Sequence, residues 1–212
     1  MKKFLLLLSL TTGVYAGNAQ TKAITDVGDE VLLYANGTWK YAGEKKHPSP
    51  HDSLMALNKT AFTRDKLATF LVKSKTINAG VYITPGEWEF EKSAPNAPSE
   101  YRFRLKALDS YAFIITEKVE VPFENLRDMV LGNAQKRAID VEMIKNEYRM
   151  VNGVKVLSLE YKGTVNGIHF IWFGYFYSSS AGTVQLVTGT VDNLFYPNYK
   201  TLENFLNGFV VL

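Results

Sequence analysis

Residues 168–177 read IHFIWFGYFY, and this stretch decides the fold. Alternate residues of a β-strand point to opposite faces of a sheet. Both faces of this segment would be apolar, and a strand of that kind is buried on both sides. We therefore expect it at the centre of a sheet that is covered on each face. One face would carry Ile168, Phe170, Trp172 and Phe176, and the other Ile171, Phe173, Tyr175 and Tyr177.

The neighbouring segments have the pattern of an antiparallel sheet. Strands are expected over 141–150, 154–162, 168–178 and 183–190, and the connections between them contain Asn152-Gly153, Asn166-Gly167 and Ala181-Gly182. Such residue pairs suit tight hairpin turns, because Asn and Gly tolerate a positive φ. Upstream, residues 101–106 alternate apolar and basic side chains, and residues 111–121 are rich in β-branched and aromatic side chains.

Two helices are expected to cover this sheet. Pro122 and Glu124 suit a helix start, and a helical stripe of apolar side chains follows at Phe123, Leu126, Val130, Ala134 and Ala138. A closing helix would place Leu202, Phe205, Leu206 and Phe209 on one stripe. The fold class predicted for residues 58–212 is therefore α+β, with a mainly antiparallel sheet of about six strands covered by helices.

The first 19 residues have the pattern of a cleavable secretory signal peptide. Lys2 and Lys3 precede a short apolar run, and small residues lead to Ala19, after which we expect cleavage. A retained membrane anchor is the alternative, but the apolar run breaks at Thr11, well short of the roughly 20 residues that span a bilayer. The sequence thus predicts a periplasmic or secreted protein with no transmembrane segment in its mature chain.

The segment between the signal peptide and the main domain divides in two. Residues 20–43 predict a short β-hairpin around Asn36-Gly37. Residues 44–57 contain Lys45, Pro48 and Pro50 and read as a linker.

Composition excludes several kinds of chemistry. The chain has no cysteine, which rules out disulfides, thiolate nucleophiles and zinc–thiolate sites. Its formal net charge is +3, and removal of Lys2 and Lys3 with the signal peptide would leave it nearly neutral. A nucleic-acid-binding protein is expected to carry a strongly basic face, so no nucleic-acid partner is predicted.

The order of elements resembles the PsbP-like (DcrB-like) α-β-α sandwich. The resemblance covers about residues 58–212 and rests on Trp88 after the Pro85-Gly86 turn, the strand after Asn152-Gly153 and the closing helix. The run Gly37-Thr38-Trp39-Lys40-Tyr41 is similar to short repeats in exported bacterial proteins. The resemblance implies a mostly non-catalytic binding or assembly role, and many members have no known activity. A fold does not by itself specify a function.

The sequence shows no catalytic constellation. His47 and His51 lie in the proline-rich linker, and His169 alternates with large apolar residues, which favours a core or subsurface position. No Gly-x-Ser-x-Gly motif of an α/β-hydrolase is present. We predict no metal site and no cofactor. Whether the protein is an enzyme is left open, and a non-enzyme is favoured.

Two groups of residues are candidates for binding. Trp88, Tyr161, Tyr175, Tyr177 and Tyr196 would either line a ligand pocket or belong to the core. Arg102, Arg104 and Lys106 share one strand face, which would either meet an anionic membrane or acidic partner or simply be solvated. The predicted function is a non-catalytic exported protein that binds a partner protein or a small apolar ligand. The alternative is an envelope-associated accessory protein that docks to a membrane surface or an assembly, and an uncharacterised hydrolase ranks third.

Overall fold

The segment IHFIWFGYFY lies inside a large sheet, as its two apolar faces require. The computed structural model describes residues 21–24, 30–34, 39–42 and 55–212. Contacts divide the chain into two units, Met1–His47 and Pro48–Leu212. The second unit contains an eight-stranded sheet in the order β4 (Leu57–Phe62), β10 (Ile139–Val151), β11 (Val154–Val165), β12 (Ile168–Ser179), β13 (Gly182–Val191), β9 (Ser110–Glu117), β8 (Tyr101–Leu105) and β7 (Trp88–Lys92).

The sheet is larger than the six strands that the sequence predicted. Its neighbours pair antiparallel except at one edge, where β4 runs parallel to β10. The two additional strands, β4 and β7, are the outermost ones. Most of their residues are exposed or half-buried. Edge strands bury little apolar surface, so their sequences lack the pattern that marks the central strands.

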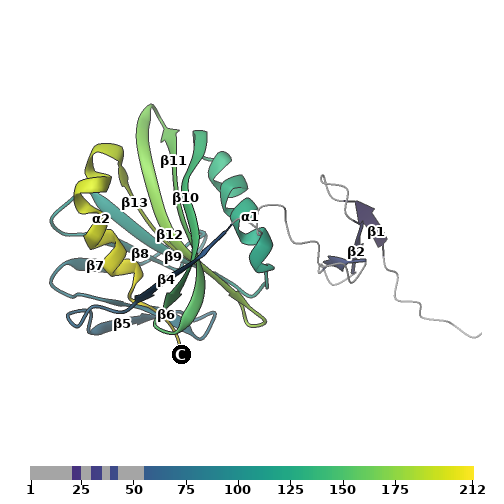
Figure 1. The fold of residues 1–212 in the computed structure, drawn as a ribbon, viewed down its shortest axis with the longest axis horizontal. Coiled ribbons are helices and arrows are strands. Elements are labelled where there is room, and N and C mark those ends of the chain that lie inside the picture. Colours follow the sequence, from purple (N-terminus) through teal and green to yellow (C-terminus); the bar gives the residue numbers. More distant parts are fainter. Residues whose placement is uncertain (1–20, 25–29, 35–38, 43–54) are drawn as a thin grey trace, which may run out of the picture. The chain divides into compact units, whose positions relative to one another are not determined.

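Two helices cover opposite faces of this sheet, so that the unit has three layers (Figure 1). Helix α1 (Phe123–Gln135) packs on β10, β11 and β12, and α2 (Asp192–Leu206) packs on β12 and β13. Both helices were predicted, but α1 ends before Ala138 and α2 before Phe209. The α+β class is thus confirmed, and the predicted helix ends are corrected.

Phe209 begins a strand instead of ending the closing helix. Strand β14 (Phe209–Val211) pairs with β6 (Ala79–Ile83), which pairs with β5 (Phe70–Lys73) in a second, antiparallel sheet. Gly208 allows the chain to approach β6 closely here, because a Cβ at this position would overlap the carbonyl oxygen of Tyr82. The small sheet and α2 together cover one face of the large sheet.

The core consists of two hydrophobic clusters, one on each face of the large sheet. Ile171, Phe173 and Tyr175 of β12 belong to the cluster under α2. Phe176 belongs to the cluster under α1, with Trp172 packed against it. Strand β12 is thus central and covered on both sides, as its sequence predicted.

Two of the predicted hairpin turns have the required backbone conformation. Asn152 and Gly153 have φ values of 49° and 83°, and Asn166 and Gly167 have values of 51° and 79°. The side chain of Asn152 also joins the β10–β11 turn to the end of α2. Its amide nitrogen donates to the carbonyl oxygens of Asn207 and Phe209, at 2.8 Å each.

The described part of the first unit contains three strands rather than the two of a hairpin. Strands β1 (Thr21–Ile24), β2 (Glu30–Leu33) and β3 (Trp39–Tyr41) pair antiparallel in that order. The predicted signal peptide, the Asn36-Gly37 turn and most of the predicted linker lie outside the described residues. Among the helices described, none is both long and apolar enough to cross a membrane.

Glycine substitutions test the close approach of β5 and β6 in the small sheet. A Cβ at Gly80 of β6 would lie 2.6 Å from the carbonyl oxygen of Val72, whereas one at Gly132 of α1 meets nothing within 4 Å. We expect Gly80→Ala to lower the free energy of unfolding by about 1–3 kcal/mol. Gly132→Ala should raise it by about 0.5–1 kcal/mol, because alanine favours the helix. Urea denaturation measures both, and equal stabilities of the two variants would contradict this packing.

Candidate functional site

A buried arginine lies between the large sheet and α2. Arg149 of β10 is 2% exposed. Its Nε donates to Glu147 Oε1 at 2.6 Å, and its Nη1 donates to Glu203 Oε1 at 2.9 Å and to Tyr175 Oη at 3.0 Å. The guanidinium also lies 4.2 Å from the ring centre of Phe62. A buried charge is tolerated only when it is paired and hydrogen-bonded, and Arg149 meets both conditions.

Further hydrogen bonds extend this cluster. Tyr199 Oη of α2 donates to Glu160 Oε1 of β11 at 2.7 Å. Tyr175 Oη donates to Asn207 Oδ1 at 2.8 Å. Asn58 of β4 donates to both carboxylate oxygens of Glu147, at 3.2 Å each. The groups of the cluster thus bind one another, and we infer that its role is structural.

The two glutamates of this cluster have opposite pKa shifts. Burial raises the pKa of Glu160, and the hydrogen bond from Tyr199 only partly offsets this effect. Burial would also raise the pKa of Glu147, but hydrogen bonds from Arg149 and Asn58 outweigh it, and the pKa is lowered. Ionisation of Glu160 should therefore lower the free energy of unfolding, whereas ionisation of Glu147 should raise it.

An open cleft of about 790 Å³ lies at the end of the large sheet, beside the first turns of α2. Residues along it include Ile144 of β10, Ile171 of β12 and Tyr196 of α2. Met143 and Phe170 also border it, but their side chains pack toward the cluster under α1. Ile144 is 37% exposed and Tyr196 is 65% exposed. The cleft therefore presents apolar surface to solvent, as ligand sites do.

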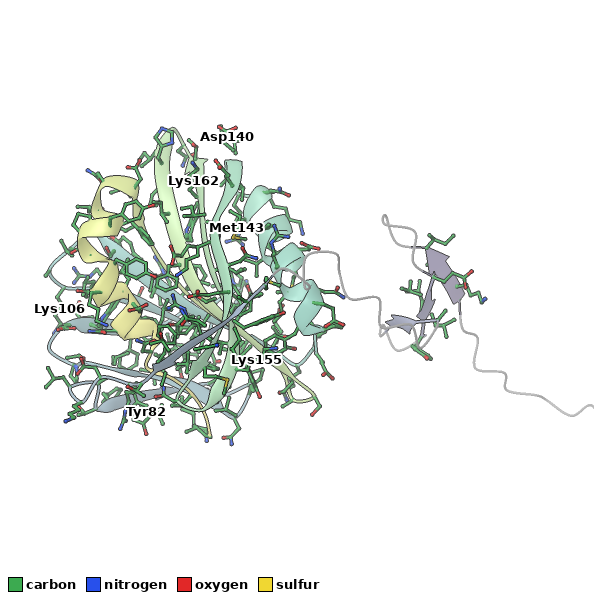
Figure 2. All side chains as sticks on the ribbon, in the orientation of Figure 1. Tyr82, Lys106, Asp140, Met143, Lys155 and Lys162 are labelled. Atoms are coloured by element: carbon green, nitrogen blue, oxygen red, sulfur yellow. The ribbon has the colours of Figure 1, made fainter. Side chains whose placement is uncertain are left out.

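Irregular pairing of β10 shapes this end of the sheet. Its register with β11 shifts between Ile139 and Glu142 and again between Met143 and Lys145. Asp140 lies in the first irregular segment with a φ of 54°. Bulges of this kind change the direction in which side chains point. Figure 2 shows Asp140 at the tip of the sheet, with Lys162 and Met143 nearer its middle.

Charged side chains also line the cleft. Lys162 Nζ lies 2.9 Å from Glu142 Oε2, and this hydrogen bond raises the pKa of Lys162. Asp140 and Asp192 line the same cleft. Within the described ranges, neither aspartate has an ion-pair partner within 4.0 Å.

His169 also lines this cleft and is exposed, rather than lying in the core or below the surface as its sequence position suggested. It belongs to the first residues of β12, whose neighbour Ile168 is 51% exposed at the end of the sheet. Its Nδ1 lies 3.1 Å from Thr164 Oγ1. The alternating pattern correctly placed His169 on a strand but did not reveal that this end of the strand is uncovered.

The predicted aromatic binding residues do not form one site. Trp88 and Tyr175 are buried in the cluster under α2, and Tyr177 packs against it. Tyr161 is buried in the other cluster, where its ring stacks on Trp172 at 5.5 Å. Tyr196 lines the cleft. Ligand binding by these residues stays a prediction. Of the five, Tyr196 is the one that lines the cleft.

The predicted basic face also carries acidic side chains. Arg104 Nη2 lies 2.5 Å from Glu89 Oε2, and Arg102 Nη1 lies 4.0 Å from Glu91 Oε1. Lys106 Nζ donates to the carbonyl oxygen of Pro85 at 3.2 Å. These cross-strand partners offset the positive charge, so the attraction of this face to an anionic surface is reduced. Docking through it stays a prediction.

Sequence reasoning did not select the polar residues of the cleft. Asp140, Glu142, Lys162 and Asp192 lie at the ends of elements that are far apart in the sequence. The interrupted alternation of IDVEMI, residues 139–144, is the one local sign of an irregular strand here. In the part of the chain that the structure describes, no three His, Asp or Glu side chains form a group that could hold a metal ion.

Replacing Arg149 tests the structural role of the buried cluster. We expect Arg149→Met to lower the free energy of unfolding by about 3–5 kcal/mol, because it leaves buried acceptors without their charged donor. Arg104→Met, which breaks an exposed pair, should cost about 1 kcal/mol or less. Denaturant unfolding compares the two variants, and an equally small effect at Arg149 would contradict the proposed role.

The two glutamates give a test by pH. Since the pKa of Glu160 is raised in the folded state, its stabilising contribution is complete at low pH and is lost as pH rises through that pKa. We expect Glu160→Gln to gain stability relative to the parent protein as pH rises above the ordinary pKa of a glutamate. Glu147→Gln should behave oppositely, losing stability at neutral pH and recovering relative to the parent as pH falls. Urea titrations at several pH values measure both, and parallel profiles would refute the assignment.

Comparison with known proteins gives a likeness of fold. No family model matches the chain, and no curated protein matches it. Similar solved structures include PsbP of the cyanobacterium Synechocystis, at 15% identity over 70% of this chain and 95% of that one, with a TM-score of 0.49. A Pseudomonas aeruginosa protein of unknown function has 13% identity over 66% of this chain and 95% of its own, with a TM-score of 0.44. LpqN of Mycobacterium tuberculosis, which is involved in cell envelope biogenesis, has 12% identity over 66% and 85%, with a TM-score of 0.43. The chain thus resembles PsbP-like proteins, as its sequence predicted.

Proposed function

We propose that this protein is an exported binding protein whose main domain holds a small, partly apolar ligand in the cleft beside α2. The observation that carries the proposal is the cleft itself. Its volume of about 790 Å³ falls within the roughly 300–1,000 Å³ of small-molecule sites. Ile144 and Tyr196 are exposed along it, so a ligand would remove their apolar surface from water.

The position of Tyr196 supports this proposal. A tyrosine ring has an apolar body and a polar tip, which suits it to contacts with amphipathic molecules. Tyr196 is 65% exposed although it lies on the helix that covers the sheet. Its ring packs edge-on against buried Phe195, with the ring centres 5.2 Å apart. One side of the ring is thus supported by the core, which limits the entropy lost when a ligand binds.

Export is part of the proposal and rests on the sequence. The pattern of residues 1–19 favours cleavage after Ala19 and release into the periplasm or the medium. Binding rather than catalysis is proposed, because the basic side chains of the cleft, Lys162 and His169, are each engaged with a neighbour. Lys162 pairs with Glu142, and His169 contacts Thr164.

Native mass spectrometry of the exported protein tests this function. The protein would be purified without detergent from the cells that make it, and we expect a chain that begins at Gln20 and carries a small-molecule adduct. Tyr196→Ala should reduce adduct occupancy about tenfold, since a contacting aromatic ring contributes on the order of 1 kcal/mol or more.

Tyr111→Ala is the matched control, because Tyr111 is 45% exposed on β9 and does not line the cleft. Its adduct occupancy should equal that of the parent protein. A parent protein without an adduct, or an adduct that Tyr196→Ala leaves unchanged, would refute binding in this cleft.

A further inference from the structure

The charges of the cleft indicate what kind of molecule it holds. Its ionisable side chains include the three carboxylates of Asp140, Glu142 and Asp192 and the single ammonium group of Lys162. Because Lys162 lies 2.9 Å from Glu142, these two charges largely neutralise each other. Asp140 and Asp192 therefore give the cleft an excess of negative charge.

Asp140 is held at this position by the backbone. Its φ of 54° lies in the left-handed region, which aspartate adopts more readily than most residues. The residue sits in the irregular segment of β10, where it is exposed. Its carboxylate is therefore available at the edge of the cleft to meet an opposite charge.

Asp192 approaches the cleft from a different element. It is the first residue of α2, where the helix dipole favours a negative charge. Two unpaired carboxylates, one on β10 and one on α2, thus line one cleft. Their placement favours a cation and disfavours an anion.

The first turns of α2 provide a further acceptor. Pro197 lies inside the helix and has no amide hydrogen. The carbonyl oxygen of Asn193, four residues earlier, therefore lacks its usual helical donor. Asn193 also lines the cleft. A positively charged amine has several N–H donors and could bind such an oxygen as well as the carboxylates.

Apolar side chains line the same cleft, and these complete the description of the ligand. Ile144 offers exposed apolar surface, and the exposed ring of Tyr196 can contact a cation through its face. We infer that the cleft selects a small amphiphile in which an apolar body carries a positively charged amine. This inference rests on the proposed function, and the cleft volume favours a small molecule over a folded partner.

Three probes with the same alkyl chain separate charge from apolarity: decylamine, decanol and decanoate. Each is titrated into the mature chain by calorimetry at neutral pH, below the concentration at which it forms micelles. We expect decylamine to bind about tenfold more tightly than decanol, and decanoate to bind most weakly. Added salt should weaken the binding of decylamine, because exposed charges are screened.

The double variant Asp140→Asn with Asp192→Asn tests the two carboxylates. Both side chains keep their size, and we expect decylamine to lose about tenfold in affinity while decanol stays within about twofold, since exposed charge pairs contribute up to about 1 kcal/mol each. Glu87→Gln with Glu117→Gln removes the same charge from exposed residues outside the cleft and should leave both affinities unchanged. Circular dichroism checks that each variant is folded.

The outcomes distinguish the inference from the proposed function. Equal binding of decylamine and decanol, or a preference for decylamine that survives in the double aspartate variant, overturns the inference but leaves ligand binding in place. Failure of all three probes to bind overturns both. Displacement of decylamine by a short lysine-rich peptide at equal concentration would show that the partner is a polypeptide and would also overturn the inference.

Discussion

The buried charge of Arg149 fixes the position of α2 over the large sheet. A guanidinium out of contact with water must have its partners within hydrogen-bonding distance, and these come from β10, β12 and α2. Asn58 connects β4 to the same group through Glu147. A shift of α2 along the sheet would separate Glu203 from Arg149 and leave the buried Nη1 without its charged acceptor. The first turn of the same helix, with Asp192 and Tyr196, is therefore held beside the sheet end where the cleft lies.

The location of the cleft follows from the lengths of the elements. Strands β11 and β12 each span 12 residues, which corresponds to about 40 Å of extended chain, whereas α2 has 15 residues and a length of about 22 Å. The helix cannot cover the whole of these strands. The ends of these strands beside the Asn166-Gly167 turn consequently stay uncovered, with His169 exposed, and the cleft forms at the boundary between covered and uncovered sheet.

The central strands could be predicted from the sequence because burial on both faces leaves a continuous apolar run. The turns at Asn152-Gly153 and Asn166-Gly167 were equally recognisable, since both residues of each have a positive φ. Strand β4 was not recognisable, because an edge strand is specified by its partner more than by its own side chains. The cleft could not be predicted from the sequence for a related reason. Its residues come from β10, β11, β12 and α2. No local sequence pattern indicates that the ends of these four elements lie together. Arg149 itself has the appearance of an ordinary polar strand residue until its partners are known.

Two kinds of charge thus lie between the large sheet and α2, and they are subject to different constraints. Arg149 and Glu160 are buried and engaged in hydrogen bonds, so a change in either alters the energy of the whole fold. Asp140 and Asp192 are exposed, and surface substitutions usually change stability by about 0.5 kcal/mol or less. The position of the cleft therefore depends on the buried cluster, whereas the selectivity that we propose for it would depend on residues that can change with little effect on folding.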